Sequence, residues 1–471
     1  MTFLSELSSN ILYLLTFCLG ALLIYYIVPQ HCKRATLLTL SIAFYLCCDW
    51  KMFFAMALVT VFTWYCGLRI KNTGRKKWLI IGCVSLVAFL AFFKYNSFFV
   101  AGAQKLLAAV GFSSDLLSVL MPLGISYYVF KAISYMVDVY RGKLPAETNL
   151  FTYALYICLF SEILCGPITR YSVFKESVSK DIVYKEENFH TGFYLVIKGL
   201  FMKVVIANRL SGYVATIFAC PENYAGLTLW FAAFCYAVQL YCDFAGYSFV
   251  MVGVTKLFGL HTTLNFDRPY FATNIKEFWN RWHISLSGWL KDYVYIPLGG
   301  GRCSKWRNKA NVIATFLVSG LWHGTGLNFL AWGLIHGVAN AATPKKMAPR
   351  GIKKVLMILL TFGIVTFGWI FFGVDSIQTA FVYLKCMVCN LSFSVEAVQN
   401  AILPFTGDNT CVAFFLTAML FVAVLFAREW YEERKKLPSL QVAGMGWQIF
   451  LLTSILLFGS FGTSGFIYAN F

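Results

Sequence analysis

Long apolar runs separated by short polar loops cover almost the whole chain, and most of these runs are long enough to cross a lipid bilayer. Together they predict about eleven to thirteen membrane segments. We place the segments at residues 9–29, 36–67 (a hairpin), 78–94, 97–112, 118–137, 150–166, 189–208, 224–242, 310–342 (a broken pair), 354–374, 376–390, 410–427 and 446–470. The residues before the first run include Glu6 and neither Lys nor Arg, so we expect a retained helix rather than a cleaved signal peptide.

The composition indicates an all-α integral membrane protein. Of the 471 residues, 59% are hydrophobic and 13% are charged, whereas soluble domains carry about 25% charged residues. The longest polar stretches, at 167–188 and 265–309, are too short to form a separate domain. We therefore predict a single membrane domain over residues 1–471.

Positive charge dominates, with 39 Lys and Arg against 21 Asp and Glu, a formal net charge of +18. The basic residues gather in short loops between apolar runs, at 33–34, 69–77, 302–309, 345–354 and 428–436. Because short basic loops stay in the cytoplasm, we place these loops there and both termini on the other side. No nucleic-acid-binding motif is present in the sequence, and we expect no nucleic-acid partner.

A tryptophan-rich amphipathic helix is expected over 275–293, with Asn274 as its N-cap and Glu277 reaching back to that cap. One face is apolar at spacings of three and four, through Ile275, Phe278, Trp279, Trp282, Leu286, Trp289, Leu290 and Tyr293. The opposite face carries Lys276, Asn280, His283 and Ser287. Such a helix lies at a membrane interface or at the inner mouth of a helix bundle. Pro297 and the glycines at 299–301 end it.

The apolar segment that follows contains a histidine, His323, about halfway along. Four polar residues recur every fourth position and share one helix face: Asn311, Thr315, Ser319 and His323. At about 1.5 Å per residue, His323 lies about 18 Å beyond the start of this stripe, near the middle of a hydrocarbon core about 30 Å thick. A turn near 326–328 sends the chain back through His336, too soon for either arm to cross fully. We predict a re-entrant or short-helix pair that lines a water-filled cavity.

Asp243 belongs to a third polar stripe, with Gln239, Gly246 and Tyr247 on the same helix face. Three such stripes on apolar helices predict one internal cavity. Asp243 either orients a base or a substrate hydroxyl there, or makes only a hydrogen bond between helices.

His323 is the candidate general base. A titratable side chain inside a membrane is costly and marks a functional site. A buried, neutral imidazole can accept the proton of an alcohol that attacks a carbonyl. The alternative is a core histidine hydrogen-bonded to Ser319 or to a carbonyl. His283 could orient a substrate or remain solvated at the interface, and we expect His336 to pack beside its neighbouring glycines.

Further motifs bear on phosphate binding, metal binding and other reaction classes. The glycines at 299–301, with Arg302 and Lys305, could hold phosphate groups of a donor, although basic loops also arise from topology alone. Cys386 and Cys389 form a lone pair with no histidine nearby, so we expect no metal site and no tightly bound cofactor. The absence of G-x-x-x-x-G-K-[ST], H-E-x-x-H and G-x-S-x-G motifs argues against ATP-driven transport, zinc proteolysis and serine esterase chemistry.

Several stretches between about 120 and 340 resemble the membrane-bound O-acyltransferase (MBOAT) family, in particular its bacterial alginate O-acetyltransferase-like branch. They are residues 121–130, 135–142, 165–168 (Cys-Gly-Pro-Ile), 243–248 (Asp-Phe-Ala-Gly-Tyr-Ser), 265–270, 277–287 (with Arg-Trp-His), 293–300 and 319–324 (with Trp-His-Gly). Phe249 and Ser161 depart from that branch, where Asp and Pro are usual. Residues 246–249 and 278–283 are also similar to the relatives that transfer D-alanine to teichoic acids, so the acyl group and the acceptor stay open.

The resemblance implies a fold and a reaction. The fold is a helical ring around a thin central tunnel. The reaction is acyl transfer, usually of acetyl, from a cytoplasmic thioester across the membrane to an extracytoplasmic polysaccharide or partner protein. His323, in Trp-His-Gly, corresponds to the catalytic histidine and His283 to a second important position. We expect supporting or substrate-binding roles for Trp322, Ser319, Asp243, Arg281, Trp282 and Asn280.

The expected setting is the bacterial inner (plasma) membrane, with lipid around a multi-pass protein. The donor substrate is an acyl thioester, either acetyl-CoA or an acyl carrier protein. The acceptor is a polysaccharide or an SGNH-type acetyltransferase outside the cytoplasm. D-alanyl transfer to teichoic acid is the alternative within the family. A proton-coupled transporter or flippase, with His323, Asp243 and His336 as a relay, and a catalytically silent scaffold for a secreted acetyltransferase are the alternatives outside it.

Overall fold

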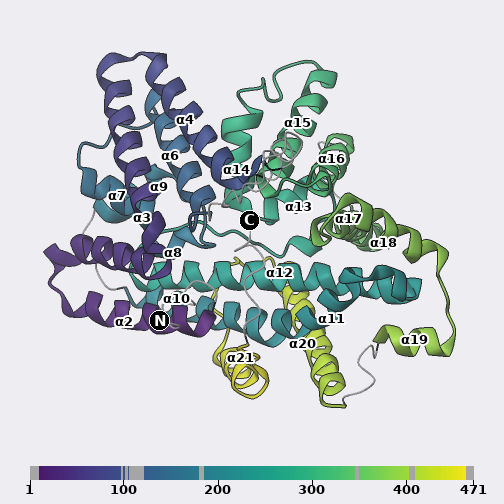
Figure 1. The fold of residues 1–471 in the computed structure, drawn as a ribbon. Helices are drawn as coiled ribbons and strands as arrows, with labels where there is room; N and C mark the ends of the chain where they lie inside the picture. The colour runs from purple at the N-terminus through teal and green to yellow at the C-terminus, as the bar shows by residue number, and fades with distance from the viewer. Residues whose placement is uncertain are drawn as a thin grey trace. The chain divides into compact units, whose positions relative to one another are not determined.

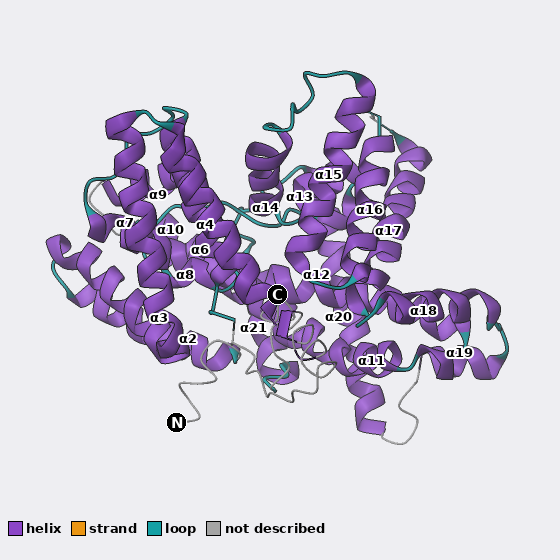
Figure 2. Cartoon of the chain, turned by 45° about the horizontal axis from the view of Figure 1, so that its top comes forward, coloured by secondary structure: helices purple, strands orange, loops and turns teal. Residues whose placement is uncertain are grey.

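The computed structural model describes residues 10–96, 99, 100, 104, 121–179, 185–344, 349–402 and 409–462. These residues form helices and connecting loops, and no strand is found among them (Figures 1 and 2). The all-α class predicted from the sequence is therefore confirmed. Most of the predicted segment 97–112 and the end of segment 446–470 lie outside the described residues.

The chain divides into two compact units, Met1–Phe189 with Val254–Thr263, and His190–Gly253 with Leu264–Phe471. The helices that begin in the first unit are α2 (Ile11–Ile27), α3 (Lys33–Thr73), α4 (Lys76–Lys94), α6 (Ile125–Tyr140), α7 (Leu150–Cys158), α8 (Phe160–Ile163), α9 (Tyr171–Ser179) and α10 (Glu186–Leu200). Those of the second unit are α11 (Asn208–Ala219), α12 (Gly226–Leu257), α13 (Ile275–Arg281), α14 (Ile284–Leu290), α15 (Lys305–His323), α16 (Leu327–Ala342), α17 (Gly351–Gly373), α18 (Ile377–Cys389), α19 (Val395–Ile402), α20 (Asn409–Lys435) and α21 (Met445–Phe458). The prediction of a single domain stays a prediction.

Five stretches of the described chain are long and apolar enough to cross a membrane: Gln30–Thr73, Lys76–Lys94, Glu186–Ala219, Gly226–Leu257 and Gly351–Gly373. Three shorter apolar helices, α2, α18 and α21, accompany them. The chain is thus a multi-pass membrane protein. The prediction of eleven to thirteen segments, a helical ring and a tunnel stays open, because several predicted segments, such as 150–166, form helices shorter than a full span.

In the first unit, the predicted hairpin at 36–67 is instead one helical stretch, α3, with a single break at Asp49. Asp49 accepts a hydrogen bond from the backbone N–H of Met52 at 3.2 Å, as an N-cap does, so a new helical run starts there. Helix α6 packs against α3 and α4, and it is buried along most of its length. Its Lys131 forms a buried ion pair with Glu162 at 2.5 Å. The family-like stretch 121–142 therefore forms the core of this unit.

In the second unit, α15 and α16 form an antiparallel hairpin, and α17 packs beside α16 (Figures 1 and 2). Small residues allow the two arms of the hairpin to approach closely. A Cβ atom added at Gly320 would lie 2.4 Å from the carbonyl oxygen of Phe329, and one added at Gly333 would lie 2.5 Å from that of Phe316. A turn is found close to the predicted one, with residues 324–326 linking the two helices. Because α15 has 19 residues, the prediction of a re-entrant or short-helix pair stays open.

Candidate active site

The predicted amphipathic helix begins as expected at its N-terminus. The side chain of Asn274 accepts the backbone N–H of Glu277 at 2.9 Å, which caps α13. The carboxylate of Glu277 reaches back one residue further than predicted, because it accepts the backbone N–H of Thr273 at 2.8 Å rather than that of Asn274.

The prediction of one continuous helix over 275–293 is wrong. His283 has a left-handed backbone (φ 42°, ψ 55°), and this separates α13 from α14. The break is held from outside the helices by the segment at 265–267. The N–H of Ile284 donates to the carbonyl of Asn265 at 2.9 Å, and the carbonyl of Arg281 accepts the N–H of Asp267 at 2.9 Å. A left-handed backbone costs free energy for a residue with a side chain, so these contacts stabilise it.

The break turns His283 inward. It is 1% exposed, and its ring meets that of Phe244 edge to face, with the ring centroids 4.8 Å apart. Neither ring nitrogen has a hydrogen-bond partner among the described residues. Burial lowers the pKa of His283 to about 3, so the ring is neutral at physiological pH. Its predicted place on the polar face beside Lys276, Asn280 and Ser287 is therefore wrong.

The predicted polar stripe on α15 is found, and all four of its residues, Asn311, Thr315, Ser319 and His323, are buried. Ser304 caps the helix by accepting the N–H of Arg307 at 3.4 Å, so α15 starts before the apolar run and ends at His323 itself. The imidazole of His323 consequently lies at the tip of the hairpin, beside the turn.

Aromatic rings surround His323, which is 3% exposed. Its ring centroid lies 4.5 Å from that of Trp322, 5.0 Å from that of Trp332 and 5.1 Å from that of Phe372. The Trp322 ring also lies 6.4 Å from the ring of His283. One indole therefore lies within contact range of both histidines, which come from different parts of the chain.

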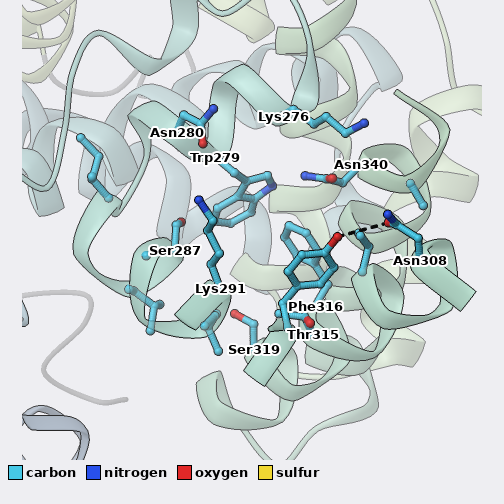
Figure 3. A pocket seen from close by; sticks show the side chains of 17 residues that line it. Lys276, Trp279, Asn280, Ser287, Lys291, Asn308, Thr315, Phe316, Ser319 and Asn340 are labelled. Atoms are coloured by element: carbon cyan, nitrogen blue, oxygen red, sulfur yellow. Dashed lines mark hydrogen bonds between the residues drawn. The ribbon is translucent and has the colours of Figure 1, made fainter. Parts of the chain in front are cut away.

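A cavity of about 680 Å³ lies beside these residues (Figure 3). It is bounded by residues of α13, of α14 and the π-helical stretch Lys291–Tyr295 that follows it, and of α15 and α16. The lining residues are Lys276, Trp279, Asn280, Ile284, Leu286, Ser287, Gly288, Leu290, Lys291, Tyr295, Asn308, Val312, Thr315, Phe316, Ser319, Asn340 and Ala341. The only charged residues among them are Lys276 and Lys291. The cavity can accordingly receive a molecule that carries negative charge or many hydrogen-bonding groups, and its volume is typical of a small-molecule site.

Among the predicted site residues, Asn280 and Ser319 line this cavity. His283 and His323 do not, but each lies directly behind its wall. Ile284, which follows His283, and Ser319, one helical turn before His323, both face the cavity. The His323 ring itself is not open to the cavity: it is buried, it packs against aromatic rings, and it is not among the lining residues.

Asp243 is also absent from the cavity lining, so the prediction that three polar stripes share one cavity is wrong for this stripe. Its carboxylate forms an ion pair with Lys203, and both side chains are at least 97% buried. Lys203 lies in a π-helical stretch, Phe201–Ala207, between α10 and α11. Asp243 thus links two helical segments, as expected if it makes only a contact between helices. Lys203 could have been found from the sequence as one of two lysines, with Lys198, within an apolar run.

The remaining predicted residues have distinct surroundings. Arg281 forms ion pairs with Glu277 and Glu433, and Trp282 is buried. Arg302, on the loop after Tyr295, and Lys305, the first residue of α15, are both exposed. Tyr295 and Asn308 line the cavity on either side of this stretch of chain. The Tyr295 hydroxyl donates to the side-chain oxygen of Asn308 at 3.3 Å, the hydrogen bond dashed in Figure 3. Sequence reasoning did not identify Lys291, Asn308, Asn340 or Glu433, because only the packing of distant segments brings them to this region.

The comparisons with known proteins agree with this architecture. Residues 8–343 match the model of the membrane-bound O-acyltransferase family. The chain is 35% identical over 427 residues to a protein of Pseudomonas aeruginosa named "Probable alginate O-acetylase AlgI", covering 88% of this chain and 81% of that protein. It is 31% identical over 431 residues to the peptidoglycan O-acetyltransferase of Helicobacter pylori, covering 80% of each.

A third relative is more distant. The teichoic acid D-alanyltransferase of Bacillus subtilis is 30% identical over 271 residues, which cover 53% of this chain and 68% of that protein. The family match covers most of the chain and includes the Arg-Trp-His break and the Trp-His-Gly hairpin tip. On this evidence the protein is an acyltransferase and belongs to the membrane-bound O-acyltransferase family.

Proposed function

We propose that this enzyme transfers an acyl group, most simply acetyl, from a cytoplasmic thioester to a hydroxyl group of an extracytoplasmic polysaccharide or of a partner acetyltransferase. The observation that carries the proposal is the position of His323 one helical turn beyond Ser319, which lines a cavity whose only charged lining residues are two lysines. The relatives named for alginate and peptidoglycan O-acetylation support acetyl as the acyl group and a polysaccharide as the acceptor.

In the proposed reaction, His323 accepts the proton of the acceptor hydroxyl as its oxygen attacks the thioester carbonyl. The new C–O bond forms, the C–S bond breaks, and the leaving thiolate takes the proton from the imidazolium. The products are an ester and a free thiol, so no further reactant is needed. The aromatic surroundings of His323 exclude water, which strengthens any hydrogen bond to the developing oxyanion.

The cavity is the proposed site for the arm of the donor that carries the thioester. Lys276 and Lys291 supply positive charge, and Asn280, Asn308 and Asn340 supply amide groups, which Figure 3 shows around the space. Arg302, on the exposed loop before α15, and Lys305, at the start of α15, are placed to attract phosphate groups of coenzyme A or the acidic surface of a carrier protein. Because the His323 ring is covered, transfer requires a local shift of the surrounding aromatic side chains.

The setting proposed for the reaction is the bacterial inner membrane. An SGNH-type acetyltransferase outside the cytoplasm, or the polysaccharide itself, receives the acyl group. D-alanyl transfer is the second candidate, favoured by the identity with the teichoic acid D-alanyltransferase. The transporter alternative needs Asp243 in a proton relay, and the pairing of Asp243 with Lys203 argues against it.

The experiment uses the purified protein in lipid nanodiscs with radiolabelled acetyl-CoA, acetyl carrier protein or D-alanyl carrier protein. Alginate oligosaccharides, peptidoglycan fragments and lipoteichoic acid serve as acceptors. We expect release of free thiol, with label on an acceptor or on the protein, for one of the donors. If no thioester is cleaved with any donor while the protein remains folded, the proposed function is wrong.

A further inference from the structure

The last turns of α20 carry three glutamates, Glu429, Glu432 and Glu433, that lie beyond the region matched by the family model. None of them is fully exposed. Glu429 is buried and accepts the hydroxyl of Tyr241 at 2.6 Å. Carboxylates that point into a membrane protein at such a position are costly, so each needs a partner.

Glu433 finds its partner in Arg281. Its two carboxylate oxygens accept from the two terminal nitrogens of the guanidinium at 2.9 and 3.1 Å, which is a bidentate arrangement. Each side chain is 17% exposed. The Nε atom of Arg268 lies 3.8 Å from the same carboxylate. A bidentate, partly desolvated pair of this kind fixes geometry as well as charge.

The two arginines belong to the segments that create the His283 break. Arg281 is the last residue of α13, two positions before His283, and its carbonyl accepts the N–H of Asp267. Arg268 follows Asp267 and also has a left-handed backbone, with φ 46°. Arg281 donates in addition to the carbonyl of Arg268 at 3.5 Å. Glu433 therefore contacts both segments that hold the break at His283: the end of α13, through Arg281, and the segment at 265–268, through Arg268.

We propose that Glu433 is a positioning residue of the enzyme: through Arg281 and Arg268 it fixes the break that places the His283 imidazole between Phe244 and Trp322. The expected loss of kcat rests on the proposed function. The expected displacement of the His283 ring does not. Glu433 does not touch the cavity, so its effect on transfer passes through the position of the His283 ring.

The adjacent residue offers a matched control. Glu432 accepts a hydrogen bond from Arg428 of its own helix at 2.8 Å, and no hydrogen bond or ion pair with the His283 region is found for it among the described residues. Glu432→Gln and Glu433→Gln thus make the same chemical change on the same helix turn. Only Glu433→Gln weakens the contact to Arg281.

The test compares the two variants in nanodiscs by thermal midpoint, by kcat and KM for the acyl-thioester donor, and by NMR of protein labelled with 13C in its histidine rings. The His283 signal is assigned from its loss in His283→Gln. For Glu433→Gln we expect a displaced His283 signal, a fall in kcat of about 10- to 100-fold and a donor KM within about two-fold of wild type, since small misplacements act on the reacting geometry. For Glu432→Gln we expect wild-type values. The charge exchange Arg281→Glu with Glu433→Arg should recover part of the kcat.

An undisplaced His283 signal in Glu433→Gln would overturn the proposal, as would an unchanged kcat. Equal losses in Glu432→Gln would also overturn it, because they would indicate a general effect of α20. Should Glu433→Gln fail to fold, Glu433→Asp takes its place, because it keeps the charge and shortens the side chain. An undisplaced His283 signal or an unchanged kcat in Glu433→Asp would then overturn the proposal. A wild-type protein that cleaves no thioester would refute the proposed function, while the His283 signal would still decide the positioning role.

Discussion

The imidazole of His323 meets the indole of Trp332 edge to face, at 83° and with ring centroids 5.0 Å apart. His323 ends one arm of the α15–α16 hairpin and Trp332 lies on the other, so the position of the ring depends on how closely the arms pack. Phe372 of α17 closes a further side of the ring at 5.1 Å. The hairpin is therefore the element on which the candidate general base depends most directly.

Close packing of the hairpin predicts a difference between two glycines. In Gly333→Ala, the new methyl group meets the carbonyl of Phe316, and we expect a loss of about 1–3 kcal/mol in the free energy of unfolding. Gly363 on α17 has no atom within 4 Å of an added Cβ. Gly363→Ala should therefore be neutral or slightly stabilising, by up to about 1 kcal/mol. Thermal unfolding in detergent distinguishes the two, and equal midpoints would contradict the close approach of the arms.

The buried Lys203–Asp243 ion pair predicts that loss of either charge lowers the stability of the fold. Asp243→Asn removes the carboxylate charge that pairs with the buried Lys203 and should cost about 3–5 kcal/mol. Replacing both partners, as Lys203→Met with Asp243→Leu, should recover much of that stability, since an apolar pair needs no desolvation of charge. Stability and acyl transfer are measured on the single and double variants. If the double variant is as stable as wild type but inactive, Asp243 has a chemical role, as the proton-relay alternative requires.

The contribution of Lys291 to donor binding can be tested directly. Lys291 lines the cavity, and Lys291→Met removes its charge while keeping most of the apolar length of the side chain. We expect the KM for the acyl-thioester donor to rise about ten-fold, equivalent to about 1.4 kcal/mol, with little change in kcat. Lys353→Met, at an exposed position outside the cavity lining, serves as the control. An unchanged KM in Lys291→Met would show that Lys291 does not bind the anionic part of the donor.

The buried state of His283 predicts a pH dependence of stability. Its folded-state pKa of about 3 lies below the value of about 6.5 for an exposed histidine. The unfolded chain therefore binds more protons between these values, and stability falls as the pH is lowered from about 6.5 toward 3. His283→Gln should reduce the slope of unfolding free energy against pH by up to about 1.4 kcal/mol per unit in that window. An unchanged slope would mean that the ring is accessible to protons in the folded state.

The sequence was informative wherever a pattern repeats along one helix. Spacing alone predicted the buried stripe from Asn311 to His323, the turn after it and the N-cap at Asn274. The break at His283 could not be predicted this way, because residues 275–293 keep their helical period across it. The contacts that impose the break come from Asn265 and Asp267, whose hydrogen bonds no local pattern reveals.

Two other features depend on partners that are distant in the sequence. The sequence indicates that Asp243 is a buried polar residue, but its role depends on Lys203, which lies 40 positions away on another helix. Arg281 and Glu433 are separated by 152 positions. The cavity arises where α13, α14, α15, α16 and the π-helical stretch Lys291–Tyr295 meet. Its lysines and amides therefore cannot be distinguished from other polar residues by sequence alone.

The most direct test of the account replaces His323. His323→Gln keeps a polar side chain of similar size, and His261→Ala changes an exposed loop histidine as a control. We expect His323→Gln to retain the thermal midpoint of the folded protein and to lose acyl transfer from the labelled thioester by at least about 100-fold, while His261→Ala remains active. Transfer at the wild-type rate in folded His323→Gln would contradict the assignment of this imidazole as the general base.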